Sequence, residues 1–419
     1  MYAIVLGLGK SGKAAKELLT KNGYLVDVYD RNGSNELNFE KDYLIAVISP
    51  GFCEKDIISE IESRNIPIIS EIELAYRYAN FPTVAVTGTN GKSTVVKLIK
   101  EMLTSCGYDA ECTGNFGYPY SLLVQSENKV AVLEASSFQL ERVDMFSPDV
   151  AIITNITPDH MDRYNTFDEY VSAKKNIFKN QLSTDLLIAN YDDEVVRQVV
   201  KDAKSKVIFF SAKNKVNGCY LVDNCIVKDV GEKQVRLINV EDLYSTYPFE
   251  IENCLCAVTF AISIGLGVRD ILQVVKNYNG LKHRLSFVGE FNGKKYYDNS
   301  KATNVASCLA SVNAISGNIA LILGGSSKNE DFKYLFEKLP NNVKYIAVCG
   351  DNSESIIKNS GIYSSITKKY PDLESIIQNV SGMEQIDSVV YAPSSASFDK
   401  YSCFEERGEV FCSLVKKFA

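Results

Sequence analysis

The sequence lacks the features that mark several common classes of protein. It has no excess of basic residues: 45 Lys and Arg stand against 52 Asp and Glu, and the net charge of −7 argues against a nucleic-acid partner. No apolar run approaches the roughly 18 residues of a membrane span, so no membrane partner is expected. The amino terminus also lacks the basic start and the small-residue cleavage site of a signal peptide.

Paired cysteines and histidine are scarce as well. None of the eleven cysteines form a C-x-x-C pair, and Cys254 and Cys256 fall in an apolar helical stretch, where small core residues are the plain interpretation. These absences together predict a cytoplasmic protein with reduced thiols. Only two histidines occur, His160 and His283, so both are candidates for functional roles.

The sequence does contain strand-like apolar runs that alternate with helical stretches, which predicts an α/β fold. A chain of 419 residues is long enough for about three domains of ~150 residues. We place the three blocks at residues 1–82, 83–281 and 282–419. Short alternating pieces from about residue 207 to 240 predict a small antiparallel insertion in the second block. The predicted strands cover residues 2–6, 25–29, 44–49, 67–69, 83–87, 130–134, 150–155, 319–323, 345–349 and 388–391.

A glycine-rich turn in the second block has the context of a phosphate-binding loop. The run GTNGKST at residues 88–94 follows a predicted strand and precedes a helix with apolar residues at i, i+3 and i+4 spacing. The usual first glycine of such a loop is replaced by Val86, which affects only the start of the turn. Lys92 is expected to reach the β- and γ-phosphates, and the Ser93 hydroxyl is expected to bind Mg²⁺.

A second glycine loop opens the chain. The run GLGKSG at residues 7–12 has the G-x-G-x-x-G spacing after a strand and before a helix, and Asp30 follows at the end of the next strand. This pattern predicts a bound phosphate or pyrophosphate and a ribose, from either NAD or a uridine nucleotide. A purely structural tight turn is the remaining alternative. Lys10 and Ser11 lie inside the loop and could touch the anion directly.

Acidic and histidine residues follow the next two strands of the second block. Glu134 ends one of these strands, and Asp159 and His160 follow the other. Because the carboxyl ends of parallel strands meet at one sheet edge, we expect both segments to lie beside the phosphate loop. A carboxylate is a typical Mg²⁺ ligand, whereas histidine is not, so His160 predicts a second metal or a proton-handling role.

The third block carries cations and hydroxyls at successive strand ends, which predicts a site for an anion such as a carboxylate. The segments are KHR at residues 282–284, YDNSKATN at 297–304, GGSSK at 324–328 and APSSASF at 392–398.

These motifs together resemble the Mur ligases of peptidoglycan synthesis. The resemblance rests on the runs at residues 88–94, 134–140, 155–164 and 299–304, whose order and spacing match over essentially the whole chain. It implies a Rossmann-like first domain that binds the uridine substrate. It also implies a central ATP-binding domain with a P-loop ATPase-like parallel sheet and a Rossmann-like third domain that binds the amino acid. The implied enzyme is an ATP-dependent ligase that adds D-glutamate to UDP-N-acetylmuramoyl-L-alanine, acts in the cytoplasm and is a monomer.

The resemblance also implies a role for individual residues. The cofactors are ATP and two Mg²⁺, with one ion on Ser93 and Glu134 and the second on His160. A helix lysine is expected to be carbamylated and to support the metal; counting along EYVSAKKNIF places it at Lys174, with Lys175 as the near miss. The implied ATP contacts are Thr89, Asn90, Gly91, Lys92, Ser93, Thr94, Asn253, Arg284, Asp298 and Asn299. The implied uridine-substrate contacts are Lys10, Ser11, Asp30, Arg31, Ser49, Pro50, Gly51, Asn115 and Ser136, and the implied D-glutamate contacts are Lys301, Thr303, Lys328, Ser397 and Phe404.

Three positions depart from the family pattern. The usual Asn-Asp-Ser-Lys is Asp298-Asn299-Ser300-Lys301 here, so the acid expected to contact the nucleotide is exchanged with its neighbour. Ser326 replaces an acid often found after Gly-Gly, and Cys256 replaces the second Asn of Asn-x-x-Asn.

The mechanism expected from these residues is phosphorylation of the substrate carboxylate by ATP, followed by attack of the D-glutamate amine on the acyl phosphate. Three other functions use some of the same motifs. A nicotinamide-dependent dehydrogenase would use the first glycine loop, and an ATP-driven switch would use the second loop for hydrolysis alone. A ligase of the same family could add a different amino acid.

Overall fold

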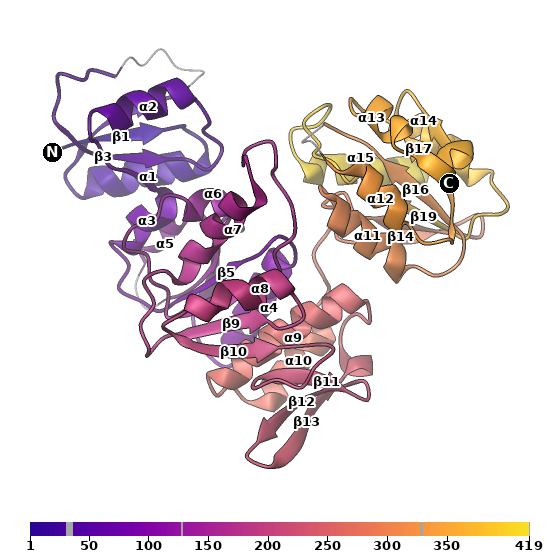
Figure 1. The fold of residues 1–419 in the computed structure, drawn as a ribbon, viewed down its shortest axis with the longest axis horizontal. Coiled ribbons are helices and arrows are strands. Elements are labelled where there is room, and N and C mark those ends of the chain that lie inside the picture. The colour runs from indigo at the N-terminus through magenta and orange to yellow at the C-terminus, as the bar shows by residue number, and fades with distance from the viewer. Residues whose placement is uncertain (31–36, 127–128, 327–329, 419) are drawn as a thin grey trace. The chain divides into compact units, whose positions relative to one another are not determined.

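A computed structural model describes residues 1–30, 37–126, 129–326 and 330–418 (Figure 1). The chain forms two compact units. The first comprises Met1–Ile156, Asp168–Thr246 and Glu250–Tyr278, and the second comprises Thr157–Phe167, Tyr247–Phe249 and Asn279–Ala419. Each unit is an α/β structure in its own right. No helix among the described residues is both long and apolar enough to span a bilayer.

A four-stranded parallel sheet in the first unit has the order β2-β1-β3-β4. Its residues alternate between two cores because successive side chains of a strand point to opposite faces. Ala3 and Val5 pack with helix α1, whereas Ile4 and Leu6 pack with helix α2, and Figure 1 shows these helices on opposite faces of the sheet. The elements are β1 (Tyr2–Leu6), α1 (Lys10–Lys21), β2 (Leu25–Tyr29), β3 (Tyr43–Ile48), α2 (Lys55–Ser63), β4 (Ile68–Ser70) and α3 (Glu71–Tyr76).

A six-stranded parallel sheet in the same unit has the order β10-β9-β8-β5-β7-β6. Strand β5 lies between β7 and β8, so the loops that leave these three strands emerge side by side at one sheet edge. The strands are β5 (Thr83–Thr87), β6 (Ala110–Gly114), β7 (Val130–Glu134), β8 (Val150–Ile153), β9 (Leu186–Asn190) and β10 (Lys206–Phe210). The helices are α4 (Lys92–Ser105), α5 (Tyr120–Leu123), α6 (Ser137–Leu140), α7 (Phe167–Lys175), α8 (Glu194–Val199), α9 (Pro248–Ser263) and α10 (Val268–Asn277).

The predicted amphipathic helix after the phosphate loop is confirmed as α4. Its apolar residues at i, i+3 and i+4 spacing are almost fully buried, and the loop residue Gly91 forms its amino-terminal cap with a φ of 85°. The apolar face of α4 therefore anchors the helix, and the helix holds the end of the phosphate loop in place.

The antiparallel insertion is confirmed, but its predicted start at residue 207 is wrong. It consists of β11 (Cys219–Val222), β12 (Cys225–Val230) and β13 (Lys233–Asn239). The preceding strand β10 instead pairs in parallel with β9 at the edge of the six-stranded sheet. The residues of β10 alternate between buried and more exposed positions, as an edge strand allows. Because this alternation is typical of antiparallel strands, it led to the wrong prediction.

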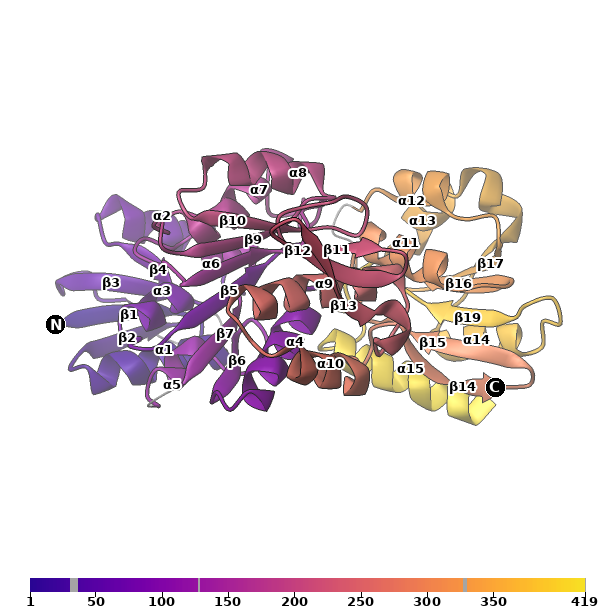
Figure 2. The same ribbon diagram turned by 90° about the horizontal axis from the view of Figure 1, so that it is seen from below.

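The sheet of the second unit is mixed, with the order β14-β15-β19-β16-β17-β18 (Figure 2). Strand β14 is antiparallel to β15, and the other pairs are parallel. Helices α11 and α12 contribute to the core on one face, and α14 and α15 to the core on the other. The elements are β14 (Ser286–Phe291), β15 (Lys294–Asp298), α11 (Val305–Ala314), β16 (Ile319–Leu323), α12 (Phe332–Lys338), β17 (Val343–Val348), α13 (Ser353–Lys358), β18 (Thr367–Lys369), α14 (Leu373–Ser381), β19 (Ser388–Tyr391) and α15 (Phe404–Phe418).

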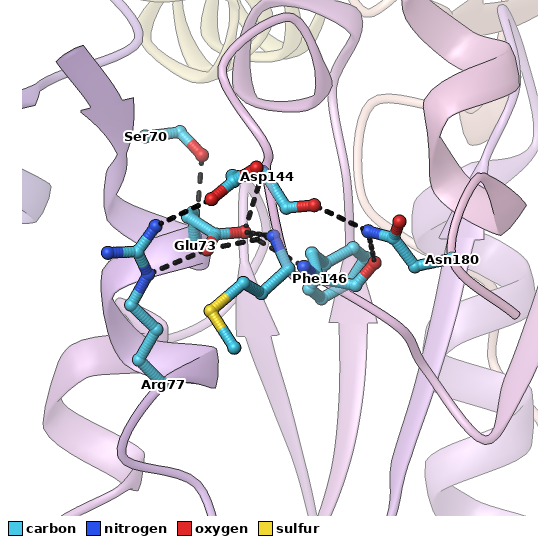
Figure 3. A network of polar contacts seen from close by, with 7 residues as sticks. Ser70, Glu73, Arg77, Asp144, Phe146 and Asn180 are labelled. Atoms are coloured by element: carbon cyan, nitrogen blue, oxygen red, sulfur yellow. Dashed lines mark hydrogen bonds and ion pairs between the residues drawn. The ribbon is translucent and has the colours of Figure 1, made fainter. Parts of the chain in front are cut away.

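A buried carboxylate links the two sheets of the first unit (Figure 3). Glu73 of α3 accepts hydrogen bonds from the backbone N–H groups of Asp144, Met145 and Phe146, at 2.9 to 3.1 Å, and from Arg77 Nε at 2.7 Å. Three N–H groups and a guanidinium compensate the cost of burying the charge. Glu73 therefore fixes the last helix of the first sheet against the segment that leads into β8.

Candidate functional site

A cavity of about 550 Å³ in the first unit collects most of the residues predicted to contact the uridine substrate. It lies between the first glycine loop and the loop that follows β6. The predicted residues that line it are Lys10, Ser11, Asp30, Ser49, Pro50, Gly51 and Asn115. Ser136 caps α6 and hydrogen-bonds with Gln139, which lines the cavity. Arg31 lies outside the described residues.

The first glycine loop is a tight turn that leaves no room for a side chain at Gly12. A Cβ atom there would lie 1.8 Å from the carbonyl oxygen of Gly7, which also accepts a hydrogen bond from Ser49 Oγ at 2.9 Å. Asp30 Oδ2 accepts a hydrogen bond from the backbone N–H of Leu8 at 2.5 Å. The start of α1 contains no acidic residue and contributes Lys10 and Ser11 to the cavity, so this end of the site favours an anion.

The second glycine loop carries two lysine ammonium groups on one carbonyl. Lys92 Nζ donates to the carbonyl oxygens of Gly88, at 2.9 Å, and Thr89, at 3.0 Å. Lys174 Nζ donates to the same oxygen of Gly88 at 2.7 Å. Two cations this close repel each other, and an anion placed against them is strongly favoured. The loop is thus built to receive a group such as a phosphate.

The two adjacent lysines of α7 have different environments. Lys174 is only 2 % exposed, and its ammonium lies 4.6 Å from the centre of the Tyr170 ring, whose hydroxyl hydrogen-bonds with the Thr89 hydroxyl at 3.0 Å. The side chain of Lys175 is 39 % exposed and pairs with Asp202. Of the two, Lys174 is the residue that the fold directs at the phosphate loop.

Two oxygen donors suited to Mg²⁺ lie beside the loop. Ser93 Oγ donates a hydrogen bond to Glu134 Oε2 at 2.6 Å, and Asn115 Nδ2 donates to Glu134 Oε1 at 2.7 Å. Within the part of the chain that the structure describes, no group of three or more His, Cys, Asp and Glu side chains could hold a metal ion. A hydroxyl and one carboxylate fit Mg²⁺, which is commonly held by one or two carboxylates together with substrate phosphates and water.

Several contacts that hold the second loop were missed by the sequence reasoning. Thr154 Oγ1 donates to the carbonyl of Asn90 at 2.7 Å, and Asn155 Oδ1 accepts from the N–H of Asn90 at 2.9 Å. Tyr170 was missed as well. The polar pair Thr154-Asn155 at the end of a buried strand was the available signal, because such positions lie at the sheet edge that binds ligands.

Asn253, a predicted ATP contact, lies against the same loop. Its Oδ1 would be 2.3 Å from a Cβ atom at Gly91, so the glycine is required there. Its Nδ2 donates to Glu250 Oε2 at 2.9 Å, and Glu250 also accepts from the hydroxyl of Tyr244. Cys256, at the position where the family has its second Asn, is fully buried in the core.

His160 belongs to the second unit, whereas Lys92, Glu134 and Lys174 belong to the first. Its backbone has a φ of 59°, and its N–H donates to Asp159 Oδ1 at 2.9 Å. Asp159 Oδ2 in turn accepts from Asn304 Nδ2 at 3.0 Å. The fold of neither unit tests whether His160 joins the phosphate loop, so its metal-binding role stays a prediction.

The remaining predicted residues that the structure describes lie in the second unit, several of them on or beside the loop after β15. Lys301 Nζ lies 4.2 Å from the centre of the Phe404 ring, and the backbone N–H of Thr303 donates to the carbonyl of Lys301 at 2.7 Å. Ser397 is buried, whereas Arg284 is half-buried. Lys328 lies outside the described residues, and Ser326 donates its N–H to the carbonyl of Ala396 at 3.0 Å.

Arg407 was also missed and holds this cluster together. Its guanidinium, fully buried, donates to the carbonyl oxygens of Ser300 at 2.7 Å, Ser395 at 2.9 Å and Ala396 at 2.9 Å. It therefore joins the loop after β15 to the loop after β19. No sequence motif predicts contacts of this kind, between a side chain and distant backbone carbonyl groups.

The two residues of the exchanged pair have separate partners. Asp298 is fully buried, and its Oδ2 lies 2.5 Å from Nδ1 of His283. This hydrogen bond raises the pKa of His283, with a further contribution from nearby Glu409 and Glu405. Asn299 instead donates from Nδ2 to Ser311 Oγ at 2.6 Å.

Comparison with known proteins adds to this geometry. Residues 86–262 match the Mur ligase middle domain, and residues 283–395 match the glutamate ligase domain of Mur ligases. The chain is 33 % identical to the UDP-N-acetylmuramoylalanine–D-glutamate ligase of Thermoanaerobacter sp. strain X514, covering 98 % of this chain and 97 % of that one. It is 35 % identical to the ligase of the same name from Staphylococcus aureus strain JH9, with 97 % and 95 % covered.

Solved structures show a similar fold at low identity. The UDP-N-acetylmuramate-alanine ligase of Thermotoga maritima aligns with a TM-score of 0.65 and 16 % identity, over 100 % of this chain and 99 % of that one. A pseudomurein peptide ligase type C of Methanothermus fervidus aligns with a TM-score of 0.66 and 15 % identity, over the whole of both chains.

The geometry of the first loop predicts opposite outcomes for two of its glycines. We expect Gly12→Ala to destabilise the protein by about 3 kcal/mol, because its Cβ would clash with the carbonyl of Gly7. Gly9→Ala is the matched control, since nothing lies within 4 Å of a Cβ there and its φ of −63° suits alanine. Thermal unfolding of both variants measures the difference. Equal melting temperatures for Gly12→Ala and the unaltered protein would contradict the geometry.

Proposed function

The chain belongs to the Mur ligase family, and within that family we propose that it joins D-glutamate to UDP-N-acetylmuramoyl-L-alanine in a reaction driven by ATP. The observation that carries the proposal is the second glycine loop, on which Lys92, Lys174 and the Ser93–Glu134 pair converge. The full-length similarity to relatives named for this reaction supports the choice of substrates.

We further propose a division into three domains: residues 1–82 bind the uridine substrate, 83–281 bind ATP, and 282–419 bind the amino acid. The four-stranded parallel sheet and the cavity at its glycine loop support the first assignment. The six-stranded parallel sheet supports the second, and the cluster around Lys301 and Phe404 supports the third. The first and third domains would then be Rossmann-like, the third with an added antiparallel strand at its edge.

The proposed reaction has two steps. An oxygen of the substrate carboxylate attacks the γ-phosphorus of ATP, the bond to the β–γ bridging oxygen breaks, and an acyl phosphate and ADP form. The amine of D-glutamate then attacks the acyl carbon and loses a proton, and the tetrahedral intermediate expels inorganic phosphate to leave the amide. A carboxylate is a poor electrophile at neutral pH, so the phosphate loop is needed to activate it.

The residues of the second loop would bind and orient the phosphates of ATP. Lys92 and the backbone N–H groups at the start of α4 would neutralise the charge that moves during phosphoryl transfer. Ser93 and Glu134 would hold one Mg²⁺ and His160 the second, and these ions supply further charge neutralisation when bound. The other proposed ATP contacts are Thr89, Asn90, Gly91, Thr94, Asn253, Arg284 and Asn299.

The remaining proposed contacts are those with the two molecules that are joined, the uridine substrate and D-glutamate. The uridine substrate would occupy the cavity formed with Lys10, Ser11 and Asp30. We propose that D-glutamate binds to Lys301, Thr303, Lys328, Ser397 and Phe404, among which a lysine cation lies over an aromatic ring and the serine is buried.

Lys174 is proposed to carry a carbamate. Reaction of its amine with CO₂ would replace an ammonium beside Lys92 with an anion and so remove the repulsion between the two cations on Gly88. The carbamate would then support the metal next to Glu134. The dehydrogenase and the hydrolytic switch are not retained, because neither activity is that of this family.

Release of ADP tests the proposed reaction directly. We expect sustained ADP release only when ATP, UDP-N-acetylmuramoyl-L-alanine and D-glutamate are all present, because without the amine the acyl phosphate of the first step is not consumed and turnover stops. A coupled assay with a panel of amino acids measures the selectivity. ADP release at full rate without an amino acid, or a preference for another one, would contradict the proposal.

Substitution of the two adjacent lysines of α7 tests the role of Lys174. We expect Lys174→Ala to lower kcat at least about 100-fold, because the loop loses a group that directly contacts it. Lys175→Ala is the matched control and should retain most activity, since its side chain is exposed and pairs with Asp202. A short carboxylic acid should partly restore Lys174→Ala, whereas bicarbonate should not. Comparable activity of the two variants would refute the assignment.

A further inference from the structure

The second unit contains a buried ion pair for which the proposed reaction has no direct use. His283 is 5 % exposed and Asp298 is fully buried, with 2.5 Å between Nδ1 and Oδ2. The other imidazole nitrogen, Nε2, lies 3.5 Å from Oε1 of Glu409 on α15. Buried charges are costly unless they are paired and hydrogen-bonded, so this pair calls for a functional or structural explanation.

The carboxylate of Asp298 is occupied on both oxygens. Oδ1 accepts from the backbone N–H of Ser300 at 2.9 Å and from its hydroxyl at 2.5 Å. Oδ2 accepts from His283 and receives a weaker contact from Cys412 Sγ at 3.6 Å. A nucleotide hydroxyl would have to displace one of these partners. The geometry therefore disfavours the direct nucleotide contact that the family resemblance implies for Asp298.

His283 is connected to both residues of the Lys301–Phe404 contact. Its carbonyl accepts a hydrogen bond from the backbone N–H of Lys301 at 3.1 Å. Its ring meets the Phe404 ring edge-on, with 6.5 Å between the ring centres. Helix α15 approaches the imidazole at Gly408, where a Cβ atom would lie 2.1 Å from Nδ1. Strand β15 and α15, neighbours in Figure 2, are thus held around one histidine.

We propose that Asp298 and His283 act as a positioning ion pair that sets the contact between Lys301 and Phe404 for binding of D-glutamate. The inference rests on the proposed function, since that function supplies the ligand. It gives Asp298, the acid that is exchanged with its neighbour relative to the family pattern, a role in binding the amino acid rather than ATP. Neither Asp298 nor His283 is required to touch a substrate.

The pair has a defined pH dependence. The groups that face His283 are Asp298 from β15 and Glu405 and Glu409 from α15, and Glu409 also lies 3.7 Å from Lys282 Nζ. The hydrogen bond from Asp298 raises the pKa of His283. The imidazolium therefore stabilises the folded state fully below its ordinary pKa of about 6.5, and this contribution is lost as the pH rises through the raised value.

Two measurements on the full-length protein test the proposal together. The chain has only two histidines, so an imidazole NMR titration resolves His283, with His160 as the internal reference. In Asp298→Asn we expect the pKa of His283 to fall, and the KM for D-glutamate to rise about tenfold, while kcat and the KM for ATP stay within about twofold. Cys412→Ala, which removes only the weak thiol contact, should match the unaltered protein.

Titration of the unaltered protein keeps the test independent of the variant's folding. The KM for D-glutamate should rise with pH at a midpoint equal to the NMR pKa of His283. A rise in the KM for ATP without a change in His283 would assign Asp298 to the nucleotide and overturn the proposal. If Asp298→Asn alters the pKa of His283 but leaves every kinetic constant unchanged, the pair has only a structural role, and this result would overturn the proposal too. If the unaltered protein shows no activity with D-glutamate, the proposed function is wrong, but the NMR titration still reports whether Asp298 and His283 form an ion pair.

Discussion

Two ammonium groups on one carbonyl oxygen are the constraint on which the rest of the structure depends. Lys92 and Lys174 both donate to the oxygen of Gly88, from different helices. Gly88 lies close against Thr154, directly after β8, where a Cβ atom on the glycine would be only 1.9 Å from Thr154 Oγ1. The fold thus places two cations close together, and an anion that binds between them, or the conversion of one lysine to an anion, lowers this electrostatic cost. The phosphate binding and the carbamylation proposed above would each supply such an anion.

A single side chain links this loop to the cavity of the first glycine loop. Asn115 lines that cavity and also donates to Glu134, whose other oxygen accepts from Ser93. The hydrogen bonds from three backbone N–H groups to Glu73 join the same two sheets at a second point, between α3 and the segment before β8 (Figure 3). A substrate in the cavity and a nucleotide on the second loop would thus bind to one rigid frame, as an in-line phosphoryl transfer requires.

The sequence predicted those parts of the structure that depend on local pattern. Strands β1, β2, β5 and β7 were predicted to the residue, because continuous apolar runs end at glycine turns or at an acid. The hairpin of β14 and β15 was missed, although its turn holds Asn292 and Gly293, both with positive φ, a strong hairpin signal. Thr154 and Arg407 were missed because they contact backbone atoms far away in sequence, and no spacing encodes such contacts. The loops that carry the functional residues could thus be predicted from the sequence, whereas the distant residues that hold these loops in place could not.

The central claim is that the second glycine loop transfers a phosphoryl group to a carboxylate oxygen. Isotope transfer tests it most directly. The carboxylate of UDP-N-acetylmuramoyl-L-alanine is labelled with ¹⁸O, the ligation is run with ATP and D-glutamate, and the released phosphate is analysed by mass spectrometry. The account predicts that one labelled oxygen passes to each phosphate, since the acyl phosphate breaks at the carbon–oxygen bond. Unlabelled phosphate accompanying amide formation would contradict it.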